Sequence, residues 1–324
     1  MTDKSHTQAS RAPRMVPPPS FPLIISPRGR HGNLMFQYML AAQLQRRLGP
    51  RAVVHGPGMP EWGCAATPVP KQPTSPLVLD GHLFDLDEIA HCLRAGLCNA
   101  IVLRGWGMRV EYYPEIDECR ALFKSDVQGQ QVGDDEVLIN VRAEDIESGR
   151  HPGYFPLPFD FYASVIRAEG KRPVFMGQLQ PGPYVQALRQ RFPLARYLPL
   201  GTPIEDFQTM RNAGCVVPSI SSFAWLATWL SESAHTIHLP VAGLFDPRRE
   251  RQNLMPVGDA RYRYWSVDFP PMQERPGIHA ATWAAAPRNV VGRSRDWAIG
   301  IARAGLTRRV VVKPGQPVGA PRAA

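Results

Sequence analysis

From Phe21 onward, short apolar runs alternate with amphipathic segments of ten or more residues, and this alternation is the strongest constraint on the fold. Strands that alternate with helices build parallel sheets covered by helices on both faces. A polar stretch over residues 124–135 interrupts the pattern, and the alternation then resumes. The sequence therefore predicts an α/β fold with two Rossmann-like parallel-sheet lobes.

The pattern divides the chain into four regions. We expect a disordered N-terminal tail over residues 1–20, one lobe over 21–125, a second, ligand-binding lobe over 126–270, and a basic C-terminal extension over 271–324, disordered apart from a short helix near its middle. The predicted strands cover residues 21–26, 52–55, 77–79, 100–104, 136–142, 173–176, 215–218 and 236–239. The predicted helices cover residues 33–48, 87–95, 115–123, 159–169, 183–192, 204–212, 222–231 and 294–304.

The distribution of charge argues against a nucleic-acid partner. The formal net charge is +9, but residues 21–270 hold 25 basic and 25 acidic side chains, so the excess lies in the two ends. A body without net charge offers no general attraction for a polyanion. No apolar run approaches the ~20 residues that cross a bilayer, and the N-terminus lacks an apolar signal segment. We expect a cytoplasmic protein whose basic C-terminal tail is available for peripheral contact with anionic lipid.

Signals for a metal are weak. The five cysteines are odd in number and include no C-x-x-C pair, which favours reduced, mostly buried thiols. Asp85-Leu86-Asp87 has the D-x-D spacing of some metal–nucleotide sites, but it stands where a helix needs a capping carboxylate. We interpret Asp85 as a helix cap and expect no metal and no cofactor.

The first segment that can carry chemistry follows the strand at residues 21–26. Residues 28–32 form a loop with two glycines, and a helix is predicted from Asn33. Glycines let a backbone approach a ligand closely, and the free N–H groups at a helix start favour an anion. Arg30, Gly32 and Asn33 are therefore candidate phosphate contacts, and an ordinary strand-to-helix turn is the alternative.

The second segment is the apolar strand at 136–142, which delivers Arg142 and then Glu144 and Asp145. The carboxyl ends of parallel strands form the ligand-binding edge of a sheet. Arg142 is suited to a pyrophosphate because its planar fork donates two hydrogen bonds and keeps its charge. A salt bridge from Arg142 to Glu144 or Asp145 is the alternative. Gln178, after the next strand, is either a base contact or a plain loop residue.

The third segment, Ser219-Ile220-Ser221-Ser222, lies between a strand and an apolar helix that begins with Phe223. A serine at a helix start is usually an N-cap, in which its hydroxyl accepts backbone N–H groups. The same geometry also binds phosphate, because hydroxyls and N–H groups point outward together. Both interpretations stay open for Ser221 and Ser222.

Taken together, the three segments resemble the fucosyltransferase superfamily, in the family's order and over residues 22–245. GRHGN followed by MFQY resembles the G-x-G-N-Q-x-F-Q-Y opening of the alpha-1,2-fucosyltransferases of glycosyltransferase family 11, with Leu34 in place of the glutamine. SSFAW at 221–225 matches the family's N-S-S-F-S-W-W, and Ser-Ser-Phe recurs in protein O-fucosyltransferases. Arg142 and Asp145 match two residues of the superfamily's H-x-R-R-x-D, whereas Asn140 and Ala143 replace the other two.

The resemblance implies a two-lobed B-type glycosyltransferase that transfers L-fucose from GDP-fucose to a glycan hydroxyl with inversion and without metal, as in polysaccharide biosynthesis. It implies that Arg142 stabilises the leaving diphosphate, and that Glu144 or Asp145 takes the acceptor proton, unless Asp145 instead orients Arg142. The implied donor contacts are Arg30, Gly32, Asn33, Arg142, Gln178, Ser221, Ser222 and Phe223. The altered arginine motif leaves two alternatives: an inactive nucleotide-sugar or glycan-binding module, and a transferase for another GDP-sugar.

Overall fold

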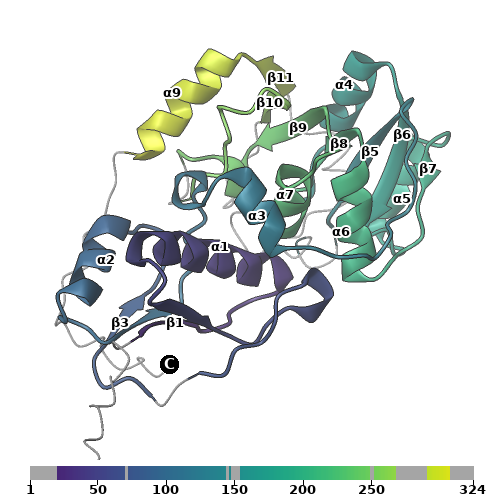
Figure 1. Ribbon diagram of the computed structural model, residues 1–324. Helices are drawn as coiled ribbons and strands as arrows, with labels where there is room; N and C mark the ends of the chain where they lie inside the picture. Colours follow the sequence, from purple (N-terminus) through teal and green to yellow (C-terminus); the bar gives the residue numbers. More distant parts are fainter. Residues whose placement is uncertain are drawn as a thin grey trace, which may run out of the picture.

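The computed structural model of the protein describes residues 20–69, 72–143, 146, 154–248, 252–267 and 290–306. Two lobes, each built on a sheet of parallel strands with helices packed on it, lie side by side (Figure 1). The predicted α/β architecture with two parallel-sheet lobes is confirmed.

The N-terminal lobe has a four-stranded sheet in the order β2-β1-β4-β3, with every neighbouring pair parallel. Its strands are β1 (Phe21–Ile25), β2 (Ala52–His55), β3 (Pro76–Leu79) and β4 (Ala100–Leu103). Its helices are α1 (His31–Leu48), α2 (Leu86–Arg94) and α3 (Ile116–Leu122), with short 3-10 turns η1 (Pro60–Trp62) and η2 (Val110–Tyr112).

The C-terminal lobe has a seven-stranded sheet in the order β11-β10-β9-β8-β5-β6-β7, parallel except at β11. The strands are β5 (Glu136–Val141), β6 (Arg172–Gly177), β7 (Arg196–Tyr197), β8 (Cys215–Val217), β9 (Thr236–Val241), β10 (Tyr262–Val267) and β11 (Val290–Arg293). The helices are α4 (Phe159–Glu169), α5 (Pro183–Arg191), α6 (Pro203–Asn212), α7 (Ser222–Trp229) and α9 (Arg295–Leu306), with a 3-10 turn η3 (Gly243–Phe245).

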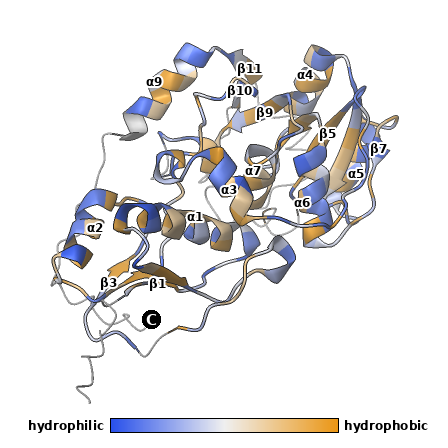
Figure 2. Ribbon diagram, in the orientation of Figure 1, coloured by the Kyte–Doolittle hydropathy of each residue, from blue (hydrophilic) through white to orange (hydrophobic). Residues whose placement is uncertain are grey.

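The burial of a strand determines how clearly it can be recognised in the sequence as an apolar run. All six residues of β5 are buried, because helices cover both faces of this central strand, so it forms a continuous apolar run. The strands of both sheets are mainly hydrophobic, whereas the helices carry hydrophilic residues on one side (Figure 2). By contrast, β7 has only two residues, neither of them buried, and it lies at the edge of its sheet.

The C-terminal sheet extends beyond residue 270, the end that the sequence predicts for this lobe. Strand β11 pairs antiparallel with β10, and α9 follows it at the place where a helix was expected near residues 294–304. Residues 290–306 are therefore part of the folded molecule. The rest of the predicted tails, residues 1–19 and 307–324, lies outside the described residues.

Two smaller predictions are also confirmed. Asp85 is the N-cap of α2, and its side chain accepts from the backbone N–H groups of Asp87 and Glu88. The five cysteines are unpaired, four of them buried, and burial raises the pKa of the Cys119 thiol to about 12. In the part of the chain that the structure describes, we find no helix with the length and apolar character of a membrane span.

Candidate functional site

The topology of the C-terminal sheet marks one position for a ligand. From β5 the sheet continues through β6 and β7 on one side and through β8, β9 and β10 on the other. Open α/β sheets bind ligands outside the carboxyl ends of the strands where the order reverses in this way. We call the carboxyl ends of β5 and β8 the switch point. Here the hydroxyl of Ser219 donates to Asn140 Oδ1 over 2.6 Å, and both side chains are buried.

The chain passes from β8 through the switch point into α7. Ser221 is the N-cap of this helix, since its Oγ accepts from the backbone N–H of Phe223 at 3.2 Å and of Ala224 at 3.4 Å. Its oxygen thus satisfies two amides that would otherwise be open to a ligand. Ser221 is 9% exposed, whereas Ser222 is partly exposed. Ser222 is therefore the better placed of the two serines to touch a bound group.

The start of α1, from the other lobe, lies against the start of α7. The hydroxyl of Ser222 donates to Asn33 Oδ1 over 3.1 Å, which joins residues 189 positions apart. A Cβ on Gly32 would lie 2.8 Å from the backbone nitrogen of Phe223, closer than real contacts allow. Only glycine lets the two helix ends approach this closely. The structure thus brings four predicted residues together from two lobes: Gly32, Asn33, Ser222 and Phe223.

The start of α1 is built differently from that of α7. Its N-cap is Arg30, and no side chain among the described residues caps the helix. Arg30 is exposed and adds positive charge to the amide-rich end of the helix. This end can therefore attract an anion, as the sequence predicts for Arg30.

Arg142 directly follows β5, on the opposite side of the switch point from α7. Its guanidinium carbon lies 4.6 Å above the ring of Tyr154, a cation–π contact that restricts where the side chain can go. Gln178 supports the neighbouring backbone, because its Oε1 accepts from the N–H of Ala143 at 2.8 Å. Gln178 therefore holds the backbone beside Arg142 in place. The contact with a nucleotide base, expected from its position, stays a prediction. Glu144 and Asp145, the predicted carboxylates, lie outside the described residues.

Sequence reasoning gave no role to Gln37, although it belongs to the MFQY segment. Its side chain is fully buried, and its Nε2 donates to the carbonyl oxygens of Ser26 and Leu103 at 2.9 Å each. These oxygens lie at the carboxyl ends of β1 and β4, where the order of the N-terminal sheet reverses. Gln37 therefore ties together the strand ends of the N-terminal lobe, at the point that corresponds to the switch point of the other lobe.

A row of rings, which no sequence pattern predicts, also joins the lobes near the switch point. His31 lies 4.8 Å from Trp62, Trp62 lies 6.2 Å from Phe207, and Phe207 lies 5.3 Å from Phe223, measured between ring centroids. These residues come from α1, η1, α6 and α7. The row keeps Phe223 packed between the lobes, beside the two hydroxyl-bearing residues of the turn.

Glu169, Cys215 and His238 form the one group of three potential metal ligands found among the described residues. The indole N–H of Trp265 donates to His238 Nδ1 over 3.0 Å, so in neutral His238 the proton is on Nε2, 3.0 Å from Glu169 Oε1. Burial lowers the pKa of His238 to about 4 and raises that of Cys215 to about 12. Near neutral pH the thiol and the imidazole Nε2 of this group keep their protons, so a metal ion would have to displace both to bind there.

Comparison with known proteins leaves the family of this chain open. No protein-family profile matches the sequence, and no curated protein matches it. Among solved structures, the chain is similar to TibC, a bacterial iron-containing dodecameric glycosyltransferase from enterotoxigenic E. coli H10407. The TM-score is 0.40 and the identity 13%, over 88% of this chain and 72% of that chain. The fold class rests on the strand order of the two sheets.

Proposed function

We propose that the protein is a glycosyltransferase that transfers L-fucose from GDP-fucose to a glycan hydroxyl, with inversion and without metal. The observation that carries the proposal is the meeting of two strand-to-helix turns at the switch point, one from each lobe. The bond from Ser222 to Asn33 joins the two sequence segments that resemble fucosyltransferase donor contacts. Arg142, from the third such segment, directly follows the neighbouring strand β5.

In this proposal the donor diphosphate binds beside the contact between Gly32 and Phe223, against the amino ends of α1 and α7. The acceptor oxygen attacks the anomeric carbon as the bond from that carbon to the diphosphate oxygen breaks, and GDP leaves with the bonding electrons. Negative charge builds on the diphosphate, so donors fixed in advance at that position lower the barrier. Arg142 supplies the positive charge, and the hydroxyl of Ser222, the amide of Asn33 and the open N–H groups of α1 supply neutral or partly charged donors. Glu144 or Asp145 accepts the proton of the acceptor hydroxyl.

A second candidate, a nucleotide-sugar-binding module without catalysis, is favoured by one observation. Asn140 occupies the position where the superfamily has histidine, and its Oδ1 is bonded to Ser219. An amide cannot exchange a proton near neutral pH as imidazole does. If the histidine position takes part in chemistry, this chain keeps the binding turns and lacks that step.

The test begins with a thermal-shift panel of GDP, UDP, CMP and dTDP, each with and without Mg²⁺. We expect GDP alone to raise the melting temperature, and metal to add nothing. A preference for UDP, or a shift that requires metal, would overturn the donor assignment.

The catalytic part is tested by the release of GDP from GDP-fucose in the Arg142→Ala variant. Loss of a charged donor to the leaving group should lower the rate roughly 100-fold or more. Arg172→Ala is the matched control, because Arg172 opens strand β6 of the same sheet and is exposed, with Asp135 as its partner at 2.7 Å. Full activity in the Arg142 variant would refute the mechanism, and GDP binding without any turnover by the wild type would support the binding module.

A further inference from the structure

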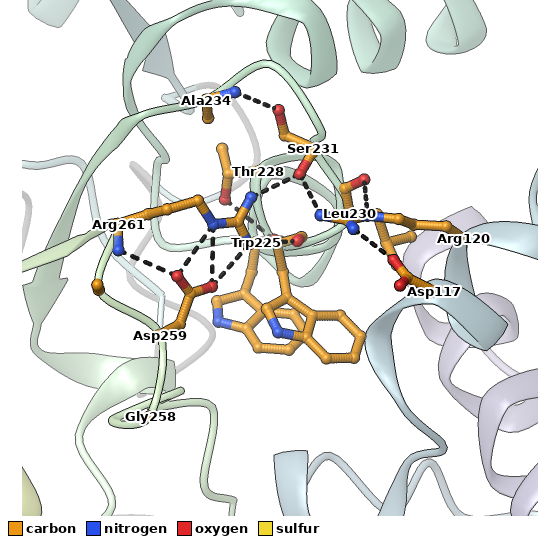
Figure 3. Close-up of polar contacts among 12 residues, drawn as sticks. Asp117, Arg120, Trp225, Thr228, Leu230, Ser231, Ala234, Gly258, Asp259 and Arg261 are labelled. Atoms are coloured by element: carbon orange, nitrogen blue, oxygen red, sulfur yellow. Dashed lines mark hydrogen bonds and ion pairs between the residues drawn. The ribbon is translucent and has the colours of Figure 1, made fainter.

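The carboxyl end of α7 is buried, and arginine side chains donate hydrogen bonds to its carbonyl groups. Trp229, Leu230 and Ser231 are at most 5% exposed, so water cannot serve the last carbonyls of the helix. Two guanidinium groups take its place (Figure 3). Arg261 donates to the carbonyl oxygens of Trp229 and Ser231, and Arg120 donates to those of Leu230 at 3.2 Å and Ser231 at 2.6 Å.

Each guanidinium is held in turn by its own carboxylate. Arg120 Nη1 lies 2.6 Å from Asp117 Oδ1, and Arg261 Nη2 lies 2.6 Å from Asp259 Oδ2. The two arginine side chains are less than one-fifth exposed. A planar fork held by a carboxylate loses little further freedom when it binds a carbonyl, so these contacts fix the helix end firmly.

The two arginines belong to different lobes. Arg120 lies in α3 of the N-terminal lobe, and Arg261 directly precedes β10 of the C-terminal lobe. In Figure 3 they approach the end of α7 from opposite sides and converge near Ser231. The end of α7 is therefore fixed relative to both sheets at once.

Between its two ends, α7 packs on rings of the N-terminal lobe. Trp225 lies 5.7 Å from Phe36, and Trp229 lies 5.9 Å from Tyr113 and stacks on Trp225 at 5.0 Å. The helix has eight residues and is about 12 Å long, so a displacement at one end is carried to the other as a rigid shift. Its first turn contacts Gly32 and Asn33, where little displacement is tolerated.

We propose that Arg120 and Arg261 are positioning residues for the phosphate-binding turn at Ser222. They act through α7, without touching the donor, and Arg120 sets the distance between that turn and the start of α1 in its own lobe. The inference rests on the proposed function for its ligand, but its structural part can be measured in the absence of any ligand.

The first measurement is amide hydrogen exchange of the full-length, ligand-free protein. In Arg120→Ala we expect faster exchange at both ends of α7, including residues 222–225, because the whole helix shifts. Faster exchange confined to residues 229–234 would show a purely local cap and overturn the proposal. This readout holds whether or not the protein binds GDP.

The second measurement is the dissociation constant of GDP by calorimetry. Arg120→Ala should weaken GDP binding roughly tenfold, as expected for a lost, well-placed phosphate contact. Arg120→Lys keeps the charge and one donor, so it should recover part of the affinity, whereas Arg120→Met should not. Val165→Ala, a buried truncation in α4, lowers stability elsewhere in the C-terminal lobe and should leave the affinity unchanged.

Arg46→Ala is the matched surface control, because Arg46 pairs with Glu118 of α3 at 2.8 Å and lies within the same lobe. An unchanged GDP affinity in Arg120→Ala, with wild-type binding intact, would refute the positioning role. A wild type that does not bind GDP would refute the proposed function, and the exchange data would then decide the positioning role alone.

Discussion

The turn from β1 into α1 and the turn from β8 into α7 face each other, but they satisfy their backbone amides differently. Ser221 caps α7 with its own oxygen, whereas Arg30 leaves the start of α1 without a side-chain cap among the described residues. The capped turn is stable and presents one hydroxyl, that of Ser222. At the uncapped turn the N–H groups of Asn33 and Leu34 donate to the carbonyl oxygen of Arg30, so a diphosphate bound beside the two turns would meet the N–H groups of His31 and Gly32.

Adding a side chain at Gly32, where the two turns touch, should have the largest effect. In Gly32→Val the added atoms meet the backbone of Phe223, which a single rotamer change cannot relieve. We expect a loss of about 1–3 kcal/mol in the free energy of unfolding, as for other overpacked sites, and little remaining GDP binding. Denaturant unfolding and calorimetry measure the two effects.

Gly300→Val is the control for this substitution. Gly300 lies in α9, and nothing approaches the place of its missing Cβ within 4 Å. Here we expect less than about 0.5 kcal/mol of change, because only helix propensity is altered. Equal effects at both glycines would mean that the two turns do not need to touch.

Substitutions of the two serines of the capped turn should affect different properties, the free energy of unfolding for Ser221 and the affinity for GDP for Ser222. Ser221→Ala removes an N-cap and should cost about 1 kcal/mol of stability, with GDP affinity close to that of the wild type. Ser222→Ala should leave the stability close to that of the wild type and weaken GDP binding roughly tenfold or more, as for one lost hydrogen bond to a charged group. Thermal unfolding and calorimetry on both variants test this. The reversed pattern would assign the phosphate contact to Ser221.

The positive charge of Arg30 at the uncapped turn should make a smaller, salt-dependent contribution to the affinity for GDP. Arg30 is exposed, so Arg30→Gln should weaken GDP binding by about threefold at low salt and less at high salt, where surface charges are screened. Arg167→Gln, at an exposed arginine of α4, serves as the control. A loss that does not change with salt would indicate a direct, desolvated contact instead.

Substitutions at a third strand-to-helix turn, from β3 into α2, should have the smallest effect, and only on the free energy of unfolding. Asp85→Ala removes its cap and should cost about 1 kcal/mol, whereas Asp85→Asn keeps an acceptor oxygen and should cost less than half of that. Unfolding curves measured with and without Mn²⁺ should coincide for the wild type. A clear stabilisation by Mn²⁺ that disappears in the Asp85 variants would revive the metal interpretation of the D-x-D sequence.

Local patterns in the sequence predict most of the fold, for identifiable reasons. Strand β5 is apolar throughout, and α4 begins and ends where its periodicity does. Strand β10 was missed because Arg263 and Ser266 interrupt its apolar residues, so it forms no continuous apolar run, and β7 is too short to show any period. The boundaries of the predicted elements differ from those of the structure by at most two residues, as helix caps and strand ends usually do.

The candidate site was predictable only in part. The turns at Gly32 and Ser222 were identified by resemblance, and their contact joins residues 189 positions apart. The contact of Arg120 with Leu230 joins residues 110 positions apart, and an arginine in an amphipathic helix gives no sign of such a partner. Long-range pairings of this kind depend on how the lobes pack, which periodicity does not encode.

The packing of α7 also bears on how the chain reaches its native state. The helix follows β8 in the chain, yet Trp225 and Trp229 pack on rings of the N-terminal lobe, and Arg120 binds its end. Residues 126–306 synthesised alone would expose this apolar helix to water, and residues 21–125 alone would expose the surface that receives it. Neither lobe is then an autonomous folding unit, and the protein should unfold in a single cooperative transition although its backbone has two sheets.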